Sequence, residues 1–338
     1  MPGHIINIAV IGYGYWGPNL VRNFQEIEGA RVALCCDAMN DRLAKAKAKH
    51  PSIAVTQDYD EVITNPGVDA VAIATPIGTH YPLARKALEY GKHVLVEKPL
   101  AASVSEAESL VEIATKKSLS LMVNHTFIYT GAVRKMKEII DRGDLGDLYY
   151  FDSVRINLGL IQHDVNVLWD LAPHDIAILD HLVSERPISV CANGACHLGN
   201  GIENVAYLSV YFNSGFIAHF HNNWLAPVKI RTVLLGGSKK MILYDDMEAS
   251  EKVKIYDRGV DVNTPEHMHR ALIAYRLGDM WAPNLDACEA LRGMAQEFID
   301  SIEAGRRPLT DGENGLNVVR ILEAAEMSVK KRGKEVKL

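Results

Sequence analysis

The sequence lacks the features that mark membrane, secreted and metal-binding proteins. No apolar run comes near the roughly 20 residues that a membrane-spanning helix needs, and the run at residues 5–11 is also too short for the core of a secretory signal. The five cysteines (35, 36, 191, 196 and 288) are odd in number and form no Cys-x-x-Cys pair. Such cysteines are typical of unpaired thiols in a reducing compartment, so we expect a cytoplasmic protein without disulfides or a metal site.

Basic charge is not in excess either. With 36 Lys and Arg against 42 Asp and Glu, the formal net charge is −6, which gives no electrostatic attraction for nucleic acid or for an anionic membrane. The apolar content of 48% is that of an ordinary globular protein. The 338 residues are enough for two domains, each with its own core. We therefore expect small-molecule partners, held by local groups.

A glycine-rich motif near the start predicts a dinucleotide site. Residues 5–17, IINIAVIGYGYWG, form a short apolar strand that runs into a Gly12-x-Gly14-x-x-Gly17 turn and then a helix. Gly12 permits the tight turn, Gly14 lets the backbone approach a pyrophosphate, and Gly17 lets the helix pack closely on the strand. The diphosphate would lie at the positive N-terminus of the helix. A plain structural turn is the alternative, but the strand, the helix and an acidic residue at the expected distance favour the cofactor.

Asp37 predicts which cofactor is bound. It ends the second predicted strand, where a carboxylate accepts hydrogen bonds from the adenosine ribose and repels a 2′-phosphate. NAD is therefore expected, and NADP is less favoured. Arg42 could contact such a phosphate, although an arginine on a surface helix is the simpler interpretation.

The first part of the chain predicts an α/β fold. Short apolar strands alternate with amphipathic helices as far as residue 123, a pattern typical of a parallel sheet covered on both faces. The expected strands are 5–11, 32–36, 70–74, 93–96 and 119–123, and the expected helices are 15–28, 40–49, 80–90 and 104–117. We predict a doubly wound, NAD-binding Rossmann domain over residues 1–123.

The rest of the chain predicts an α+β domain over residues 124–338. After a helix at 131–142 and a turn cluster at 143–146, hairpin signals separate several strand-like segments. The expected strands are 147–157, 187–197, 203–213, 215–224, 230–236 and 239–244, and the expected helices are 169–183, 284–303 and 312–331. Consecutive hairpins predict an open-faced antiparallel sheet, with the C-terminal helices packing back.

One face of this sheet is expected to join subunits. The strand at 203–213 alternates between two faces, with Ala206, Leu208, Val210 and Phe212 on one and Tyr207, Ser209 and Tyr211 on the other. His219 and His221 also belong to the second face. An aromatic face with polar tips suits a partly hydrated contact, so we expect a homodimer or a homotetramer built on it.

The carboxyl ends of the first sheet's strands are expected to hold the chemistry, since nicotinamide reactions take place at this edge. One strand ends at Thr75-Pro76, where Thr79 is expected to cap a helix that His80 opens. The next strand ends at Val96-Glu97-Lys98-Pro99, which places an ammonium group in the crevice. A snorkelling surface lysine is the alternative, but the position beside the nicotinamide favours a function for Lys98.

A second candidate pair lies in the segment WDLAPHD, residues 169–175. Asp170 and His174 are four residues apart and therefore share one face of the predicted helix. Because a proline costs no helix hydrogen bond in the first turn, Pro173 predicts that the helix begins near residues 169–172. By itself, such a pair is more often solvated or capping than catalytic.

Four motifs together resemble, in order and spacing, those of the Gfo/Idh/MocA oxidoreductases. They are IGYGYWG near the start, ATPIGTH at 74–80, GKHVLVEKPLA at 91–101 and WDLAPHD at 169–175, and the likeness covers essentially the whole chain. The resemblance implies that Lys98 contacts the reacting hydroxyl and that Asp170 and His174 complete the site. Many members have a glycine-rich lead into the last motif, whereas residues 166–168 here are Asn-Val-Leu and a proline precedes the histidine. This departure leaves the substrate open.

The motifs also predict the residues that contact the cofactor. These are Gly12, Gly14, Tyr15, Trp16, Gly17, Asp37, Thr75, Pro76, His80 and Glu97. The expected reaction is the reversible oxidation of a secondary alcohol. His174 is suited to accept the hydroxyl proton, because a histidine titrates near neutral pH, and Lys98 would stabilise the developing alkoxide. Asp170 would orient His174 or bind a neighbouring hydroxyl, and a proton-accepting Lys98 is the alternative.

A sugar substrate needs several hydrogen-bonding groups beyond the reacting centre. The expected substrate contacts are His125, Tyr129, Arg155, Asn157, Gln162, Lys229 and Arg231. The last two lie beside Trp224 in the run 224–231, which would suit a diphosphate, with a basic strand edge as an equal alternative. Together with the resemblance, this run favours oxidation at C3 of a nucleotide-linked sugar such as a UDP-N-acetylhexosamine.

Other functions stay open. The resemblance implies relatives that prepare 3-keto sugars for transamination in surface polysaccharide assembly, but also inositol-type dehydrogenases that act on free polyols and 3-ketoreductases that work in the opposite direction. A non-catalytic NAD-sensing protein is the rival from a different class. The presence of both Lys98 and His174 disfavours it.

Overall fold

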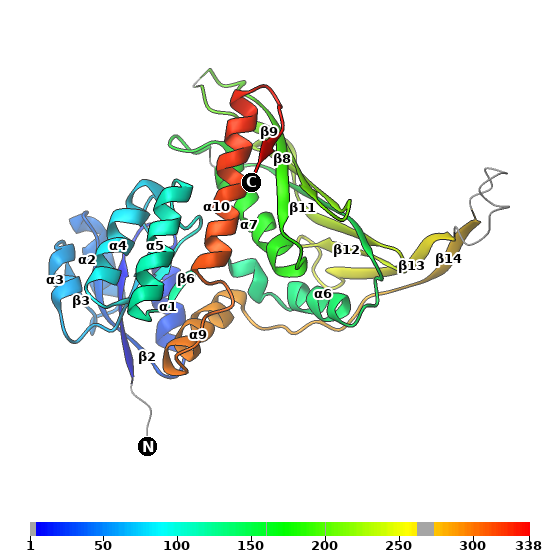
Figure 1. The fold of residues 1–338 in the computed structure, drawn as a ribbon. Coiled ribbons are helices and arrows are strands. Elements are labelled where there is room, and N and C mark those ends of the chain that lie inside the picture. The colour runs from blue at the N-terminus through cyan, green and yellow to red at the C-terminus, as the bar shows by residue number, and fades with distance from the viewer. Residues whose placement is uncertain (1–4, 160, 200, 262–273) are drawn as a thin grey trace. The chain divides into compact units, whose positions relative to one another are not determined.

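The computed structural model describes residues 5–159, 161–199, 201–261 and 274–338, which form two compact units (Figure 1). The first unit comprises the chain up to residue 129 together with residues 288–320, and the second comprises residues 130–287 and 321–338. The expected division at residue 123 differs from these units because residues 288–320 join the first one.

The first unit is built on a six-stranded parallel sheet with the strand order β3-β2-β1-β4-β5-β6. The strands are β1 (Ile6–Ile11), β2 (Ala30–Cys36), β3 (Ala54–Thr56), β4 (Ala70–Ile73), β5 (His93–Val96) and β6 (Leu121–Val123). The helices are α1 (Gly17–Glu26), α2 (Asn40–Lys49), α3 (Tyr59–Thr64), α4 (His80–Glu89) and α5 (Val104–Lys117), with short 3-10 turns η1 (Ile77–Thr79) and η2 (Thr126–Tyr129). Every residue of β4 is buried, as expected for a strand covered on both faces. The predicted doubly wound Rossmann fold is confirmed.

Two elements of this unit go beyond the prediction. β3 is a three-residue edge strand with exposed or half-buried side chains, and α3 has six residues. Neither is long enough to repeat a strand or helix period, which is the signal that sequence patterns provide.

Residues 288–320 belong to the first unit because they pack on its sheet and helices. In α9 (Ala290–Glu303), the ring of Phe298 lies edge-to-face with that of Phe24 in α1, with centroids 6.3 Å apart. After α9, the hydroxyl of Thr310 donates to the carbonyl oxygen of Val123 at 2.7 Å, and it lies 3.0 Å from the hydroxyl of Tyr129. The chain is thus fastened to the end of β6.

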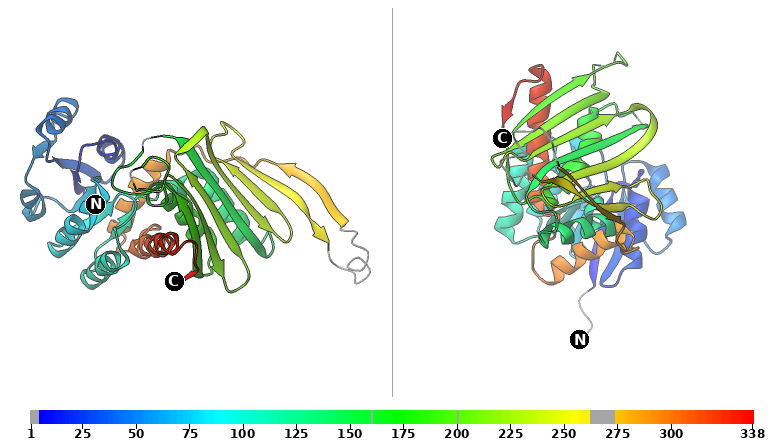
Figure 2. Two further views of the ribbon diagram at one scale, coloured as in Figure 1. Left: turned by 90° about the horizontal axis from the view of Figure 1, so that it is seen from above. Right: turned by 90° about the vertical axis from the view of Figure 1, so that its right-hand side faces the viewer.

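The second unit contains a nine-stranded sheet with the order β14-β13-β12-β11-β7-β10-β9-β8-β15. The strands are β7 (Leu148–Leu158), β8 (Pro187–Ala195), β9 (Val205–Phe212), β10 (Ile217–Asn223), β11 (Leu225–Gly237), β12 (Met241–Asp245), β13 (Val253–Asp261), β14 (Ala274–Trp281) and β15 (Val336–Lys337). Its helices are α6 (Gly131–Asp141), α7 (Val167–Leu182) and the second part of α10 (Gly312–Lys330). Figure 2 shows helices of this unit along one face of the sheet, and α7 packs on β7, β9 and β10.

The expectation of consecutive hairpins is correct for most neighbours in this sheet and wrong for three pairs, β11 with β7, β15 with β8 and β10 with β7, of which the first two are antiparallel. β10 runs parallel to β7, because α7 and the β8–β9 pair lie between them in the sequence and the chain returns by a crossover. β13 and β14 were not predicted, since a register shift between Tyr256 and Arg258 interrupts their alternation.

The two faces of β9 differ as predicted. Ala206, Leu208, Val210 and Phe212 are buried. Tyr207 is 46% exposed on the other face, where its ring stacks on that of His221 with centroids 4.6 Å apart. His219 lies on the same face, 3.2 Å from a carboxylate oxygen of Asp152.

Helix α7 begins earlier than predicted. Asn166 caps it, and its side-chain oxygen accepts from the backbone N–H groups of Leu168 and Trp169. Pro173 is therefore the seventh residue of the helix and not part of its first turn. The prediction was wrong because it ranked the proline above the asparagine cap as the sign of a helix start.

A buried ion pair ties α7 to the sheet. The guanidinium of Arg155 in β7 donates to both carboxylate oxygens of Asp175 in α7, at 2.8 and 2.6 Å. Both side chains are almost completely buried. A bidentate pair of this kind fixes orientation as well as distance, so it sets the position of the helix above the sheet.

Replacement of Arg155 with alanine is expected to lower the free energy of unfolding by about 3–5 kcal/mol, because it leaves the carboxylate of Asp175 buried without its cation. Urea denaturation of the full chain measures this change. Arg320→Ala is the control, since Arg320 forms an exposed pair with Glu108 and such pairs contribute about 0–1 kcal/mol. Equal losses in the two variants would contradict the assignment.

Candidate functional site

The glycine-rich turn after β1 has the shape of a diphosphate cradle. Gly12 has φ +92°, and a Cβ there would lie 2.6 Å from the carbonyl oxygen of Ala74. A Cβ on Gly17 would clash with the carbonyl oxygen of Gly12. At Gly14, by contrast, the side chain of Arg42 is all that comes within 4 Å, at 3.6 Å. Gly12 and Gly17 are thus required by the protein's own backbone, whereas Gly14 leaves space beside the turn.

Asp37 lies beside this turn and is buried. One of its carboxylate oxygens accepts from the backbone N–H of Tyr13 at 2.6 Å, and the other accepts from that of Met39 at 2.9 Å. Arg42 lies 3.5 Å from the same carboxylate. The arginine that could have favoured a 2′-phosphate is therefore paired with the acid that disfavours one.

These residues fit a bound dinucleotide. The first turn of α1 has no capping side chain, Pro18 has no N–H, and the N–H groups of Asn19 and Leu20 donate to the carbonyl oxygen of Trp16. A diphosphate would therefore be attracted by the positive end of the helix and held by the backbone of the glycine turn before it. Tyr15 and Trp16 are exposed next to the turn, and their rings meet edge-to-face at 5.3 Å. We expect Gly14 to face the diphosphate and Asp37 to face the ribose.

The loops after β4 and β5 are tied together by His80. Its ring nitrogens lie 2.8 Å from the carbonyl oxygen of Pro99 and 2.9 Å from that of Thr75. Burial, opposed by these two carbonyls, lowers its pKa. The His80 side chain is buried and its two ring nitrogens face the backbone at Thr75 and at Pro99, so it fixes the loop after β4 against the loop after β5.

Lys98 follows β5 and has two buried ionisable neighbours. Burial raises the pKa of Glu97 to about 7, although Asn124 donates to its carboxylate at 2.6 Å. Burial, assisted by the charge of Lys98, lowers the pKa of His125 to about 3. Neither ring nitrogen of His125 has a hydrogen-bond partner among the described residues. A buried, unsatisfied imidazole beside a lysine is costly for folding alone, so this edge of the sheet is a candidate ligand site.

Asn124 is a residue that the sequence prediction missed. Besides donating to Glu97, its side-chain oxygen accepts from the hydroxyl of Thr126 at 2.6 Å. Its position directly after β6, at the same edge as Glu97 and Lys98, was the available signal.

In the second unit, α7 carries Asp170 and His174, both half-buried and one turn apart. The indole N–H of Trp224 donates to a carboxylate oxygen of Asp170 at 3.0 Å. Trp224 is 1% exposed and its indole bonds to α7, so the ring is not open to the diphosphate that the run 224–231 was expected to suit, with a basic strand edge as the equal alternative.

The other predicted substrate contacts fall into two groups. Arg155 is held by Asp175, Arg231 lies 3.3 Å from Asp246, and the ring of Tyr129 is buried in the first unit. These three are engaged with the protein itself. Asn157 and Gln162 are half-buried at the end of β7 and in the loop before α7, and Lys229 is exposed on β11.

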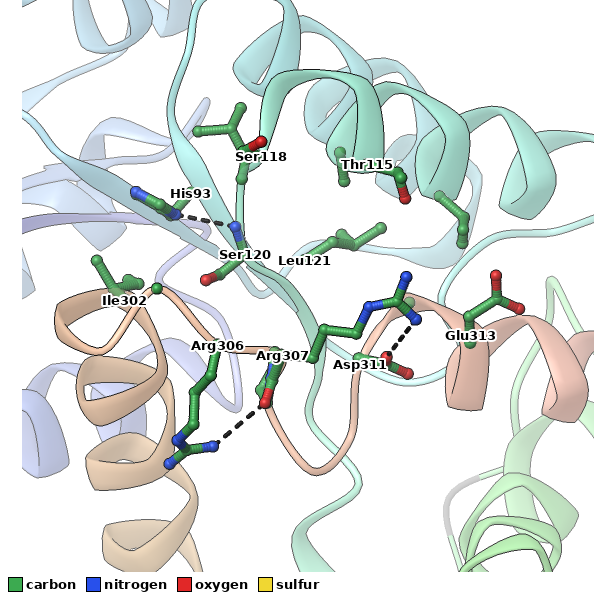
Figure 3. A pocket seen from close by; sticks show the side chains of 16 residues that line it. His93, Thr115, Ser118, Ser120, Leu121, Ile302, Arg306, Arg307, Asp311 and Glu313 are labelled. Carbon is green, nitrogen blue, oxygen red and sulfur yellow. Dashed lines mark hydrogen bonds and ion pairs between the residues drawn. The ribbon is translucent and has the colours of Figure 1, made fainter.

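The first unit also contains a cavity of about 260 Å³, whose lining side chains are drawn in Figure 3. Its lining includes His93, Ser120, Arg306 and Arg307, and it opens at the amino ends of β5 and β6. Arg306 is engaged by Glu297 and Arg307 lies 3.6 Å from Asp311. The cavity is thus at the opposite edge of the sheet from Lys98.

The described residues contain no group of three His, Cys, Asp or Glu side chains arranged to hold a metal ion. None of the helices in the described part of the chain has the length and apolar character needed to cross a bilayer.

Two family models match the chain. "Oxidoreductase family, NAD-binding Rossmann fold" matches residues 6–125, and "GFO/IDH/MocA C-terminal domain" matches residues 133–243. An uncharacterized oxidoreductase of Streptococcus pneumoniae is 32% identical over 45% of this chain, but the match spans only 40% of that protein. The scyllo-inositol 2-dehydrogenase (NADP(+)) of Bacillus subtilis is 26% identical over 97% of this chain and 94% of that protein. The solved structure of UDP-N-acetylglucosamine 3-dehydrogenase GnnA from Acidithiobacillus ferrooxidans has a TM-score of 0.82 at 23% identity, covering 96% of this chain and 98% of that one.

The glycines of the cradle are expected to respond differently to a Cβ. Gly14→Ala should weaken NAD binding by roughly 10-fold or more with little change in melting temperature, because the added carbon meets the ligand and not the protein. Gly17→Ala should lower both the affinity for NAD and the melting temperature, since its Cβ clashes with the backbone. Titration calorimetry with NAD and thermal melts measure the two effects. Unchanged NAD affinity in Gly14→Ala would show that the cofactor lies elsewhere.

Proposed function

The chain belongs to the Gfo/Idh/MocA family of NAD(P)-dependent oxidoreductases, and we propose that it oxidises a secondary hydroxyl of a sugar, at C3 of a nucleotide-linked sugar such as a UDP-N-acetylhexosamine. The proposal depends above all on the surroundings of Lys98, where Glu97 and His125 are buried ionisable groups at the carboxyl edge of an NAD-binding sheet. In this proposal, the first unit binds NAD, and the second binds the substrate and a second subunit.

The cofactor supplies the hydride acceptor when it is bound. Gly12, Gly14 and Gly17 would hold its diphosphate and Asp37 its adenosine ribose, with Thr75, Pro76 and Glu97 lining the approach to Lys98. Lys98 donates a hydrogen bond to the reacting oxygen and stabilises its negative charge.

His174 takes the proton from the same hydroxyl, and Asp170 holds the imidazole in place or binds a neighbouring hydroxyl. This mechanism requires the ammonium group of the first unit and the imidazole of the second to reach one carbinol. His125, Asn157 and Gln162 are proposed to bind the remaining hydroxyls, because the His125 imidazole has no hydrogen-bond partner among the described residues and the two half-buried amides can both donate and accept.

Two comparisons support different substrates. GnnA shares the fold, which favours a nucleotide-linked sugar, and the exposed Lys229 offers a cation to its diphosphate. The scyllo-inositol dehydrogenase is similar over nearly the whole chain, so a free polyol is the second candidate. A keto product of the first kind is chemically suited to transamination.

A substrate panel tests the proposal. UDP-N-acetylglucosamine, scyllo-inositol and myo-inositol are each incubated with NAD or NADP, and reduced cofactor is followed by absorbance. Lys98→Ala and His174→Ala should each lower kcat by roughly 10²–10⁴-fold while NAD still binds. NAD binding without reduction by any substrate would contradict the enzyme and favour the sensor. If NAD or NADP is reduced only when an inositol is the substrate, the free polyol is the substrate class and the nucleotide sugar is ruled out.

We also propose that the open face of the second sheet joins two copies of the chain, since Tyr207 is exposed there beside His219 and His221. Tyr207→Asp should shift the protein to a smaller species in light scattering coupled to gel filtration, because it buries a charge in the contact. Tyr90→Asp is the control, since Tyr90 is similarly exposed but lies in the first unit. A wild-type monomer, or dissociation by both variants alike, would contradict this face as the interface.

A further inference from the structure

Two tryptophans donate to carboxylates near the start of α7, and the two bonds are almost identical. The indole N–H of Trp224 donates to Asp170 at 3.0 Å, and that of Trp169 donates to Glu326 in α10 at 3.0 Å. Both rings are buried. They differ in their acceptors, because Asp170 belongs to the proposed site and Glu326 does not.

Trp224 is fixed in position by the backbone around it. It lies between β10 and β11, and its own N–H donates to the carbonyl oxygen of Asn204 at 2.9 Å. The next residue, Leu225, donates its N–H to the side chain of Asn223 at 2.6 Å. The ring is among the largest fully buried side chains of the described chain. An anchor of this kind holds its N–H at a constant place relative to the sheet.

The helix needs such an anchor at this turn. Pro173 has no N–H, so the carbonyl of Trp169 lacks the usual bond from the residue four positions later. The missing bond lies within the turn that carries Asp170 and His174. Arg155 holds the helix on the C-terminal side of Pro173 through Asp175, and Trp224 holds it on the N-terminal side through Asp170. The weakened turn is therefore clamped from the sheet on both sides of the proline.

We propose that Trp224 is a positioning residue for the proposed reaction, acting through Asp170 on His174. The proposal rests on the proposed function. By occupying one carboxylate oxygen, the indole restricts rotation of the carboxylate and sets the direction of the other oxygen. A hydrogen bond from an N–H group to a carboxylate is strong for its kind, and an indole does not titrate in the range in which enzymes work. The indole therefore remains a donor at every pH at which the enzyme works.

A double-mutant cycle tests this role in the full-length enzyme with the active substrate of the panel. Trp224→Phe removes the N–H and keeps an aromatic ring, and it should lower kcat by roughly 10- to 100-fold with the KM for NAD unchanged. In the Asp170→Ala background the same change should alter kcat by less than about twofold, because the residue through which it acts is gone. Trp169→Phe is the matched control and should leave kcat within about twofold of the wild type.

A second measurement does not depend on turnover. Hydrogen exchange of the indole N–H groups, followed by NMR, should become faster for Trp224 in Asp170→Ala, while Glu326→Ala should speed exchange for Trp169 instead. This readout replaces the kinetic one if Trp224→Phe does not fold.

The outcomes separate this inference from the proposed function. A wild-type kcat in Trp224→Phe, an equal loss in Trp169→Phe, or an undiminished effect in the Asp170→Ala background would overturn the positioning role while the enzyme assignment stands. Unchanged exchange of the Trp224 indole in Asp170→Ala would also overturn it. If the wild type does not reduce NAD with any substrate of the panel, the proposed function fails first, and the positioning role fails with it.

Discussion

The geometry of a parallel sheet governs the first unit, because all six strands of such a sheet end at the same edge. Residues that are far apart in the sequence are thereby collected: the glycine turn follows β1, Asp37 follows β2, and Lys98 follows β5. Asn124 follows β6 and completes the row by bonding to Glu97. No single motif creates this site. It results from placing one polar residue after each of several buried strands, and the burial of those strands keeps the row rigid.

In the second unit, the main constraint is the accurate placement of helix α7 on an open sheet. α7 is apolar on the side that packs on β7, β9 and β10, and apolar packing alone allows small rotations and shifts. Two directional contacts remove that freedom, namely the Arg155–Asp175 ion pair and the bond from Trp224 to Asp170. A buried ion pair is weak evidence for stability, since desolvation offsets much of its attraction. Its value here is orientation, because its two bonds fix the helix that carries His174.

Sequence patterns predicted what repeats over several residues or rests on a required residue type. The strands of the Rossmann domain, the alternation along β9 and the glycine turn all belong to this class. What the patterns missed depends on three-dimensional context. β3 is too short to repeat, the start of α7 was decided by the Asn166 cap, and β10 is parallel to β7 because of a crossover. The roles of Arg155 and Trp224 depend on which partner the fold brings to them, and no spacing in the sequence encodes that.

Two buried polar groups beside Lys98 lower the stability of the fold but suit the binding of a ligand. His125 is buried with neither ring nitrogen bonded among the described residues, and Glu97 carries a carboxyl whose pKa is raised to about 7 by burial. Replacing either with an apolar residue of similar size would relieve a desolvation cost of the kind that single buried groups impose. Both nevertheless flank Lys98, at the edge where an NAD-binding sheet presents its ligand. This desolvation cost is concentrated at one edge of the sheet, next to Lys98, the lysine that the family resemblance singles out. A ligand that hydrogen-bonds to these groups would explain it, because the free energy lost in folding is then recovered on binding.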